Sequence, residues 1–423
     1  MTADAAILGI SVAVLLVALV SGRIERSLIT GPMLVVTLGV LGSFLFDFEL
    51  PMTGTVTLFL EITLALVLFS DASRIDLKAL RDDHRWPQRM LLIGLPLAIL
   101  LGAAAAALLL GLPVGLALLL GVILAPTDAA LAEPVLVTDE LPMRVRQTVN
   151  VESGLNDGLA LPALFIAIAL SGAEEGLSAA DVVLPFVRQL GLGIVGGVFF
   201  GVIGAWLFGK GIASGWMGPA YHKIGIVALA LAAFGGTELV QGSGFVASFL
   251  AGMIFAAKSR NTGPGLFEFA ENESSSLVLV AFLMFGASEV RPLIENPPAI
   301  EIWALALVSL VVVRPVAIAL SLIGRRLAVP TRLFFGWFGP RGLASIVFLL
   351  LALEELPEIP PDLFDAVIVT VTLSILLHGI SAYPASMALA RSLERSFDVS
   401  MPEMEEIHPH PMRAISVRRQ SPD

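Results

Sequence analysis

Apolar stretches long enough to cross a lipid bilayer recur along the whole chain, and this constrains the fold more than any other feature. In lipid every backbone N–H and C=O group needs a partner inside the protein, so long apolar runs without strict alternation predict helices rather than a barrel. Only 14% of the 423 residues are charged, where a soluble protein carries about 25%. The sequence therefore predicts an all-α polytopic membrane protein with about thirteen spans, at 5–22, 28–46, 55–72, 90–110, 114–136, 148–171, 182–208, 223–240, 244–257, 275–288, 299–323, 333–353 and 364–389.

Lysine and arginine residues are concentrated in alternate loops of this span pattern. Of the 25 basic residues, all but four fall on one side; Arg188 and Arg291 lie on the other, and Arg314 and Arg341 lie inside spans. Because cytoplasmic loops carry an excess of Lys and Arg, we expect a cell (inner, cytoplasmic) membrane protein with its N-terminus outside and its C-terminus in the cytoplasm. Residues 1–395 form the expected membrane domain, and 396–423 a short, polar, disordered cytoplasmic tail.

The composition also excludes several kinds of chemistry. The chain has no cysteine, so disulfides, thiol catalysis and cysteine metal sites are excluded. None of its five histidines forms an HExxH pair, and His408 and His410 lie in the polar tail. We therefore expect no cofactor, no resident metal centre and no nucleic-acid partner.

Two of the expected spans are interrupted near the middle by Pro or Gly beside polar residues. The interruptions read Ala125-Pro126-Thr127-Asp128 and Gly339-Pro340-Arg341-Gly342. In an inverted repeat of six spans, one linker and six spans, these two discontinuous helices are counterparts, which is typical of a transporter's binding site. A half-helix can begin after Pro126, so we expect Asp128 to compensate helix ends beside that site; a plain helix N-cap is a compatible alternative.

The segment from Val151 to Gly158 sets two acids, a hydroxyl and an amide beside a long apolar run. Asp157 is expected at membrane depth, where an ionised carboxylate costs about 2.5–3.5 kcal/mol and indicates a functional site. Ser153 and Asp157 are four residues apart and share one helix face, although a polar packing patch would show the same spacing. Hard cations prefer oxygen ligands, so the sequence predicts a cation site from Asp157, Ser153 and Thr127, with Asp128 beside them.

Glu152 would be an expensive unpaired charge at the same depth. We expect it to pair with one of the two arginines inside spans, and we favour Arg314. Arg341 is then expected to neutralise carbonyl groups at the interruption of its own span.

Three more acids lie in or at the ends of spans. Asp71 and Glu133 suit either a cytoplasmic funnel or an ordinary solvated helix end, and Glu61 has no partner that the sequence indicates. The small residues of the segment 242–252 recur at close-packing spacing, so we expect a contact between helices there.

The interrupted spans and the Glu152-Ser153-Gly154-Leu155-Asn156-Asp157 segment together resemble the signature segments of monovalent cation:proton antiporters, in the prokaryotic sodium/proton exchanger branch that carries an Asn-Asp pair. The resemblance implies a thirteen-helix inverted repeat and a homodimer. It also implies a moving core from spans 4–6 and 11–13 beside a scaffold from spans 1–3 and 7–10. Asp157 would bind Na+ and H+ alternately, surrounded by Thr127, Ser153 and Asp128, with Asn156 in place of a second aspartate. Ala129 and Pro340 depart from the usual pattern.

The function expected from these features is secondary antiport of a monovalent cation, Na+ before Li+ or K+, against H+. If one carboxylate binds either the cation or the proton, exchange needs no second pathway through the protein. If only that acid titrates, one proton is exchanged for one cation, so the exchange is predicted to be electroneutral. A K+/H+ antiporter and a cation-coupled solute symporter are the alternatives, although the polar cluster is small for a solute. An intramembrane aspartyl protease is a remote alternative, since the chain lacks a GxGD element.

Overall fold

The computed structural model describes residues 3–24, 27–46, 54–75, 85–174, 179–259, 266–356, 358–395 and 402–404. None of these residues lies in a strand, so the described part of the chain is all-helical, as the sequence predicts. Within it, 7 helices are long and apolar enough to cross a membrane, and shorter apolar helices lie at Leu8–Gly22, Gly31–Phe46, Val114–Ile123 and Gly244–Ser259. The chain is therefore a helical, multi-pass membrane protein.

Each apolar segment expected from the sequence lies on one helix or on successive helical pieces, with starting residues that differ by up to nine positions. The N-terminal half contains α1 (Ala3–Ile24), α2 (Gly31–Phe46), α3 (Thr55–Arg74), α5 (Arg85–Arg89), η1 (Met90–Gly94), α6 (Leu95–Leu110), α7 (Val114–Ile123), α8 (Glu133–Leu136), α9 (Met143–Glu174) and α10 (Ala179–Ala213). The C-terminal half contains α11 (Pro219–Glu238), α12 (Gly244–Ser259), α13 (Leu266–Phe285), η3 (Gly286–Val290), α14 (Arg291–Glu295), α15 (Ile300–Val308), η4 (Ser309–Val313), α16 (Arg314–Ser321), α17 (Val329–Trp337), α18 (Leu343–Glu355), α19 (Pro361–Arg395) and η5 (Pro402–Met404).

Three of these pieces, η1, η3 and η4, are π-helical turns inside longer helices, where the apolar pattern predicts continuous α-helix. Each is followed after one residue by a proline, at Pro96, Pro292 and Pro315. Proline has no N–H, and its ring clashes with the carbonyl four residues earlier. A wider turn just before the proline relieves that clash without ending the helix. The turn η4 thereby sets the direction of Arg314, the first residue of α16.

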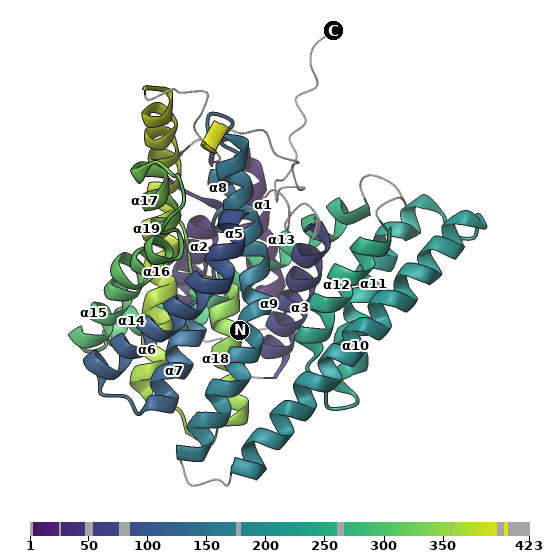
Figure 1. Ribbon diagram of the computed structural model, residues 1–423, viewed down its shortest axis with the longest axis horizontal. Helices are drawn as coiled ribbons and strands as arrows, with labels where there is room; N and C mark the ends of the chain where they lie inside the picture. Colours follow the sequence, from purple (N-terminus) through teal and green to yellow (C-terminus); the bar gives the residue numbers. More distant parts are fainter. Residues whose placement is uncertain are drawn as a thin grey trace.

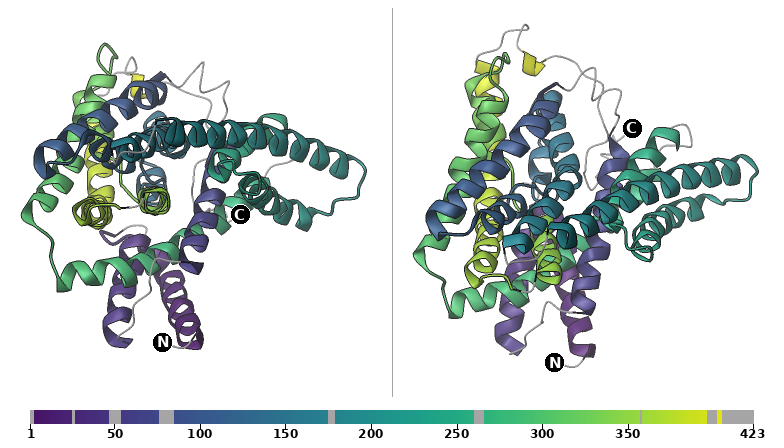
Figure 2. Two further views of the ribbon diagram at one scale, coloured as in Figure 1. Left: turned by 90° about the horizontal axis from the view of Figure 1, so that it is seen from below. Right: turned by 60° about the horizontal axis from the view of Figure 1, so that its bottom comes forward.

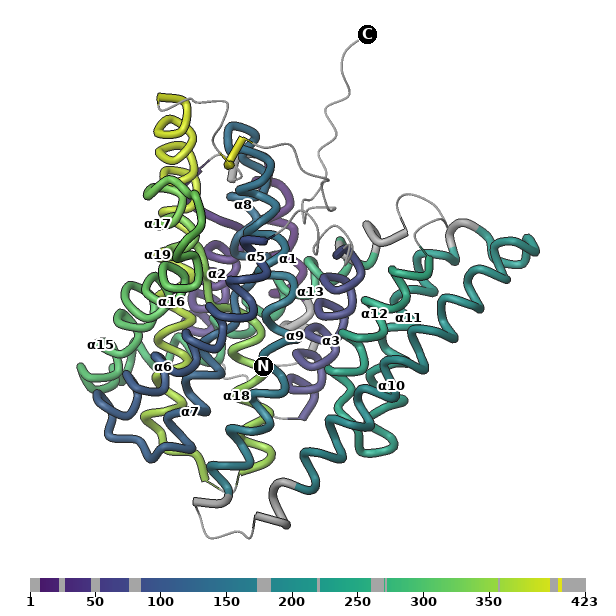
Figure 3. Tube along the Cα trace, in the orientation of Figure 1, coloured from purple at the N-terminus to yellow at the C-terminus, as the bar shows by residue number. Residues whose placement is uncertain are grey.

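The helices form two regions that Figure 1 separates clearly. We call α5–α9 together with α15–α19 the bundle, and α10–α12 the arm, which extends to one side as a diagonal group. Figure 2 shows the arm projecting from the rest of the molecule in two further views, and Figure 3 follows the same path along the chain. Helix α3 lies between the two regions, packing against α12 on one side and against α9 on the other.

Glycines allow the arm to pack closely. On α10, a Cβ at Gly197 would lie 2.7 Å from the Cβ of Leu250, so α10 and α12 approach more closely than side chains allow. On α12, a Cβ at Gly252 would overlap the backbone of Phe69 in α3. The helix contact expected for the segment 242–252 is confirmed.

The short helix η5 docks on one end of the bundle. The Nη1 of Arg144 in α9 donates to the Pro402 carbonyl (2.8 Å), and the amide of Ala328, just before α17, donates to Oε1 of Glu403 (2.8 Å). The rest of the expected tail, together with Lys78 and Arg81 of the basic loops, lies outside the described residues.

Candidate functional site

The two interrupted spans meet where their helices stop. Helix α7 ends at Ile123 and α17 ends at Trp337, and non-helical backbone follows each. The Asp128 amide donates to the Pro340 carbonyl (2.8 Å), so the two interruptions touch through their backbones. The hydroxyl of Ser345 in α18 donates to the Ile123 carbonyl (2.7 Å), which supplies one donor that the end of α7 lacks.

Asp128 accepts hydrogen bonds from two chain segments at once. Its Oδ1 accepts from the Ala130 amide (2.7 Å), while its Oδ2 accepts from the amide of Leu343 (2.9 Å), the first residue of α18. A Cβ at Gly342 would overlap this carboxylate, which explains why glycine precedes α18. Asp128 therefore places a negative charge at a helix start, where the macrodipole favours it. The half-helix expected directly after Pro126 is not present: residues 129–132 are turns and α8 begins at Glu133, so the helix start that Asp128 caps is that of α18.

Four polar side chains from α9 and the first interruption form a buried cluster. The hydroxyl of Thr127 lies 3.2 Å from that of Ser153 and 3.3 Å from Oε2 of Glu152. The Asn156 amide donates to the Thr127 hydroxyl and, at 3.5 Å, to Oε1 of Glu152. All four side chains are buried. The structure thus brings together Thr127, Ser153, Asn156 and Glu152. The spacing of four residues indicated the proximity of Glu152 and Asn156, and Thr127 and Ser153 were expected together as cation ligands.

Glu152 forms a bidentate ion pair with Arg314, the partner that the sequence favoured. Nη1 and Nη2 of Arg314 donate to the two carboxylate oxygens at 3.1 and 3.0 Å, and both side chains are buried. A Cβ at Gly339 would overlap the guanidinium, so the glycine of the second interruption makes room for it. Paired forks of this kind are among the stronger charge-assisted hydrogen bonds.

Three successive carbonyls, from the last residue of α17 to the second residue after it, receive side-chain donors. Nη2 of Arg314 donates to the Phe338 carbonyl (3.1 Å), and Nη1 of Arg341 donates to the Gly339 carbonyl (2.7 Å). Nε2 of His378 in α19 lies 2.9 Å from the Trp337 carbonyl. The expectation that Arg341 neutralises carbonyls of its own span is confirmed by this contact. His378 was considered only as a metal ligand; its spacing of four residues from Ser374 within an apolar span was the available signal.

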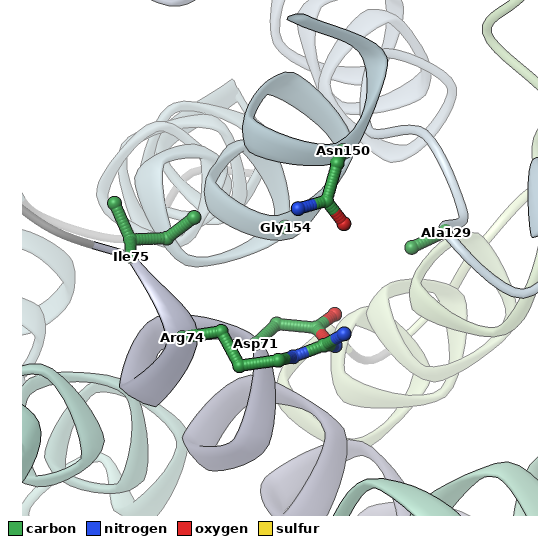
Figure 4. Close-up of a pocket in the computed structure, with 6 residues that line it drawn as sticks. All are labelled: Asp71, Arg74, Ile75, Ala129, Asn150 and Gly154. Carbon is green, nitrogen blue, oxygen red and sulfur yellow. The ribbon is translucent and has the colours of Figure 1, made fainter. Parts of the chain in front are cut away.

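Asp157 lies one helical turn beyond Ser153 and is 6% exposed. Gly154 lies three residues before Asp157, and Asn150 lies four residues before Gly154, so the three share one face of α9. That face borders a narrow cleft that is lined by Asp71, Arg74, Ile75, Ala129, Asn150 and Gly154. In Figure 4 the side chains of Asp71 and Arg74 lie together on α3 across from Asn150. The cleft reaches the helix face of Asp157 and the residue after Asp128.

The remaining acids are placed as follows. Asp71 forms a buried ion pair with Arg74 at the end of α3. Glu133 lines a larger hollow of about 100 Å³ between α8 and the helices α1, α2 and α13. Glu61 is near enough to Glu238 and Glu354 for their charges to repel its own, so the charged neighbours of this acid are other acids. Within the described residues no three His, Asp or Glu side chains gather as a metal site.

Discontinuous helices that meet beside a buried carboxylate are typical of secondary transporters. The chain matches the family described as sodium/hydrogen exchanger, transmembrane, over residues 10–388. It therefore belongs to the sodium/hydrogen exchanger family, a family of cation:proton antiporters.

The individual relatives compared with this chain share about a quarter of its residues over the matched region. The K(+)/H(+) antiporter NhaP2 of Shewanella sp. (strain MR-4) is 26% identical over 352 residues, which cover 82% of this chain and 59% of that protein. The K(+)/H(+) antiporter NhaP of Alkalimonas amylolytica is 27% identical over 351 residues, covering 81% of this chain and 59% of that protein. The chain thus spans about 59% of the length of these curated relatives.

A solved structure shares the fold. The sodium proton antiporter MjNhaP1 from Methanocaldococcus jannaschii at pH 8 superimposes with a TM-score of 0.71 at 22% sequence identity. The match covers 91% of this chain and 98% of that one. At this identity the likeness establishes the architecture.

Proposed function

We propose that this chain exchanges a monovalent cation for H+ by alternating access, with Asp157 as the group that binds both. The observation that carries the proposal is the buried carboxylate of Asp157, one turn beyond Ser153, whose hydroxyl lies 3.2 Å from that of Thr127. A carboxylate and two hydroxyls offer the oxygen ligands that hard cations prefer. Protonation removes the charge that holds the cation, so one site takes the two cargoes in turn.

The other polar groups then have supporting roles. Asp128 adjoins the cation site while it holds the start of α18. Asn156 contributes no charge, and its Oδ1 is buried and accepts no hydrogen bond from the described residues, which leaves an oxygen for a cation or a water. Glu152 stays ionised against Arg314 throughout the cycle. Arg341 compensates carbonyls at the second interruption.

At the level of the whole molecule we propose thirteen spans in an inverted repeat of six, one and six. The bundle is the moving core, the remaining helices are the scaffold, and the basic loops face the cytoplasm together with the C-terminus. The apolar side chains that α10 exposes, among them Phe199 and Trp206, support a homodimer through the scaffold. Native mass spectrometry of the purified protein tests this, and a monomer at every detergent-to-protein ratio would contradict it.

We propose Na+ as the first cargo, because the family model that the chain matches is described as a sodium/hydrogen exchanger; the names of the NhaP2 and NhaP relatives favour K+ as the second candidate. Purified protein in liposomes that contain a pH-sensitive dye and hold a proton gradient tests both. Addition of Na+, Li+ or K+ to separate samples should dissipate the gradient, with Na+ giving the highest rate. A higher rate with K+ would make the protein a K+/H+ antiporter. No response to any of the three, relative to protein-free liposomes, would contradict antiport.

The exchange should be electroneutral, because one proton replaces one cation at one carboxylate. Moving one net charge per cycle would change the free energy by about 2.3 kcal/mol per 100 mV. The test imposes a membrane potential on liposomes of fixed cation and pH gradients and finds the gradients at which net flux vanishes. An unmoved null point is expected, and a shift with potential would exclude one-for-one exchange.

A further inference from the structure

Three successive carbonyls at the end of α17 are held by three side chains from different places in the fold. A helix end leaves its last carbonyls without helical donors. Arg314 and Arg341 supply the Phe338 and Gly339 carbonyls, and both arginines belong to the charge arrangement already described. The Trp337 carbonyl accepts from the Gly339 amide (2.9 Å) and also receives Nε2 of His378 at 2.9 Å, and the imidazole lies against the Trp337 ring with centroids 4.9 Å apart. His378 is thus a second donor to this carbonyl, and the one that joins it to α19.

The other side of the imidazole connects to the far side of the same interruption. The Arg341 amide donates to the hydroxyl oxygen of Ser374 (2.6 Å), and that oxygen lies 3.0 Å from Nδ1 of His378. Because the hydroxyl oxygen already accepts from Arg341, its hydrogen is available for Nδ1. The result is a directed series of hydrogen bonds from the Arg341 amide through Ser374 and His378 to the Trp337 carbonyl. It joins the backbone before the interruption to the backbone after it.

This geometry selects one form of the imidazole. The Nδ1–H tautomer could donate to the Ser374 carbonyl (3.0 Å), but Nε2 would then face the Trp337 carbonyl as acceptor against acceptor. The imidazolium would satisfy both carbonyls but would leave the Ser374 hydroxyl hydrogen without its acceptor. It would also add a positive charge near those of Arg341 and Arg314. Only the neutral Nε2–H tautomer satisfies every group.

We propose that His378, as the neutral Nε2–H tautomer, is a positioning residue for the cation site: it fixes the second interruption to α19. The position of the second interruption affects the proposed cation ligands through the backbone. Pro340, between the two joined residues, accepts from the Asp128 amide (2.8 Å), and Asp128 adjoins Thr127. Movement of the Pro340 carbonyl therefore displaces the first interruption as well. This role rests on the proposed function, since it concerns how the cation ligands are placed.

The cation dependence of exchange tests the positioning role. His378→Leu removes both hydrogen bonds, and the apparent KM for Na+ should rise about tenfold, which corresponds to the loss of one buried hydrogen bond. The maximal rate should stay within about twofold. His378→Gln keeps an amide N–H that can reach the Trp337 carbonyl, and should restore the apparent KM to within about threefold. Ser374→Ala should raise it by an intermediate factor.

Ser386→Ala is the matched control, because Ser386 is fully buried on the same helix and its hydroxyl has no hydrogen-bond partner among the described residues. Its apparent KM should equal that of the wild type. An unchanged apparent KM in folded His378→Leu would overturn the proposal. So would equal rises for Leu and Gln, since the retained donor would then be irrelevant.

A spectroscopic measurement separates this proposal from the proposed function. Nitrogen NMR of protein labelled with ¹⁵N-histidine distinguishes the two tautomers from imidazolium, and the His378 signals are those that disappear in His378→Gln. At neutral pH we expect one protonated Nε2 and one unprotonated Nδ1. An Nδ1–H tautomer or an imidazolium would overturn the hydrogen-bond series even if exchange is observed. The expected tautomer in a protein that exchanges no cation would leave the series standing and remove only the function.

Discussion

Helices α9 and α10 follow one another in the chain, and both are long and apolar enough to span a membrane, yet they are built differently. In the span of α9 the structure buries 72% of the residues, whereas in that of α10 it buries 28%. Helix α9 carries Glu152, Ser153, Asn156 and Asp157 toward the bundle. Helix α10 exposes large apolar side chains over most of its length.

The difference shows how each region is held together. Around α9, charge and hydrogen-bond complementarity fix the geometry, and removal of one partner leaves a buried polar group behind. Between α10 and α12, shape fixes most of the geometry, through glycines such as Gly197 and Gly201 that admit the side chains of Leu250 and Ile254. The proposed cation site lies in the first region, and the second supplies a close-packed surface.

The largest effect is expected at the site acid. Asp157→Asn keeps the shape of the side chain but removes the charge, so exchange in liposomes should fall to the level of protein-free samples while the melting temperature stays unchanged. Asp139→Asn, at an acid whose side chain is 89% exposed, is the control and should exchange normally. Exchange at wild-type rates by folded Asp157→Asn would remove this carboxylate from the mechanism.

Glu152→Gln should destabilise the bundle by about 3–5 kcal/mol, because it leaves Arg314 buried without its counter-charge. Thermal unfolding in detergent measures the loss, and exchange should fall with it. The double variant with Arg314→Met should cost less than the sum of the single variants, which is the signature of a direct pair. Additive costs, or a Glu152→Gln variant that loses exchange at an unchanged melting temperature, would make Glu152 a transport group instead.

In the arm, Gly197→Ala should cost about 1–3 kcal/mol, because the new methyl group lies too close to Leu250 and to the carbonyl of Ala247. The measurement is again thermal unfolding, together with the apparent KM for the cation, which should not change. Gly191→Ala on the same helix meets no atom within 4 Å and serves as the control. A changed apparent KM in Gly197→Ala would show that arm packing and site geometry are not independent.

The smallest effect is expected for an ion pair outside the bundle's interior. Arg291 and Glu295 are 2.8 Å apart, but the Glu295 side chain is 43% exposed. Glu295→Gln should therefore cost only about 0.3–0.5 kcal/mol, and less as salt is added. A cost comparable with that of Glu152→Gln would mean that burial does not account for the difference between the two pairs.

Much of the bundle could be predicted from the sequence because its signals are local. Pro and Gly beside polar residues indicated where α7 and α17 end. The spacing of Glu152, Ser153 and Asn156 placed them together on one helix. A buried carboxylate needs an opposite charge nearby, so Glu152 required a partner, and only two arginines were expected inside spans.

What could not be predicted depends on how distant segments meet. The contact between Asp128 and the Leu343 amide joins residues 215 apart, and nothing local specifies which backbone group faces the carboxylate. The role of His378 follows only from the place where α17 stops beside α19. The π-helical turns come from proline signals that are equally common in straight membrane helices. The orientation of the spans, which was inferred from the alternation of basic residues between loops, remains a prediction.

The length of α10 has a consequence for the lipid around the protein. At about 1.5 Å per residue its 35 residues extend roughly 52 Å, while the hydrocarbon layer of a bilayer is about 30 Å thick. Such a helix can be accommodated by tilt, and in Figure 1 α10 runs at an angle to the helices of the bundle. A change in bilayer thickness then acts first on the tilt of α10, next on α12, which is locked to it by glycines, and through α12 on α3. Since Asp71 and Arg74 of α3 line the cleft, we expect bilayer thickness to act on this cleft and not on the cation ligands themselves, which α9 and the first interruption carry.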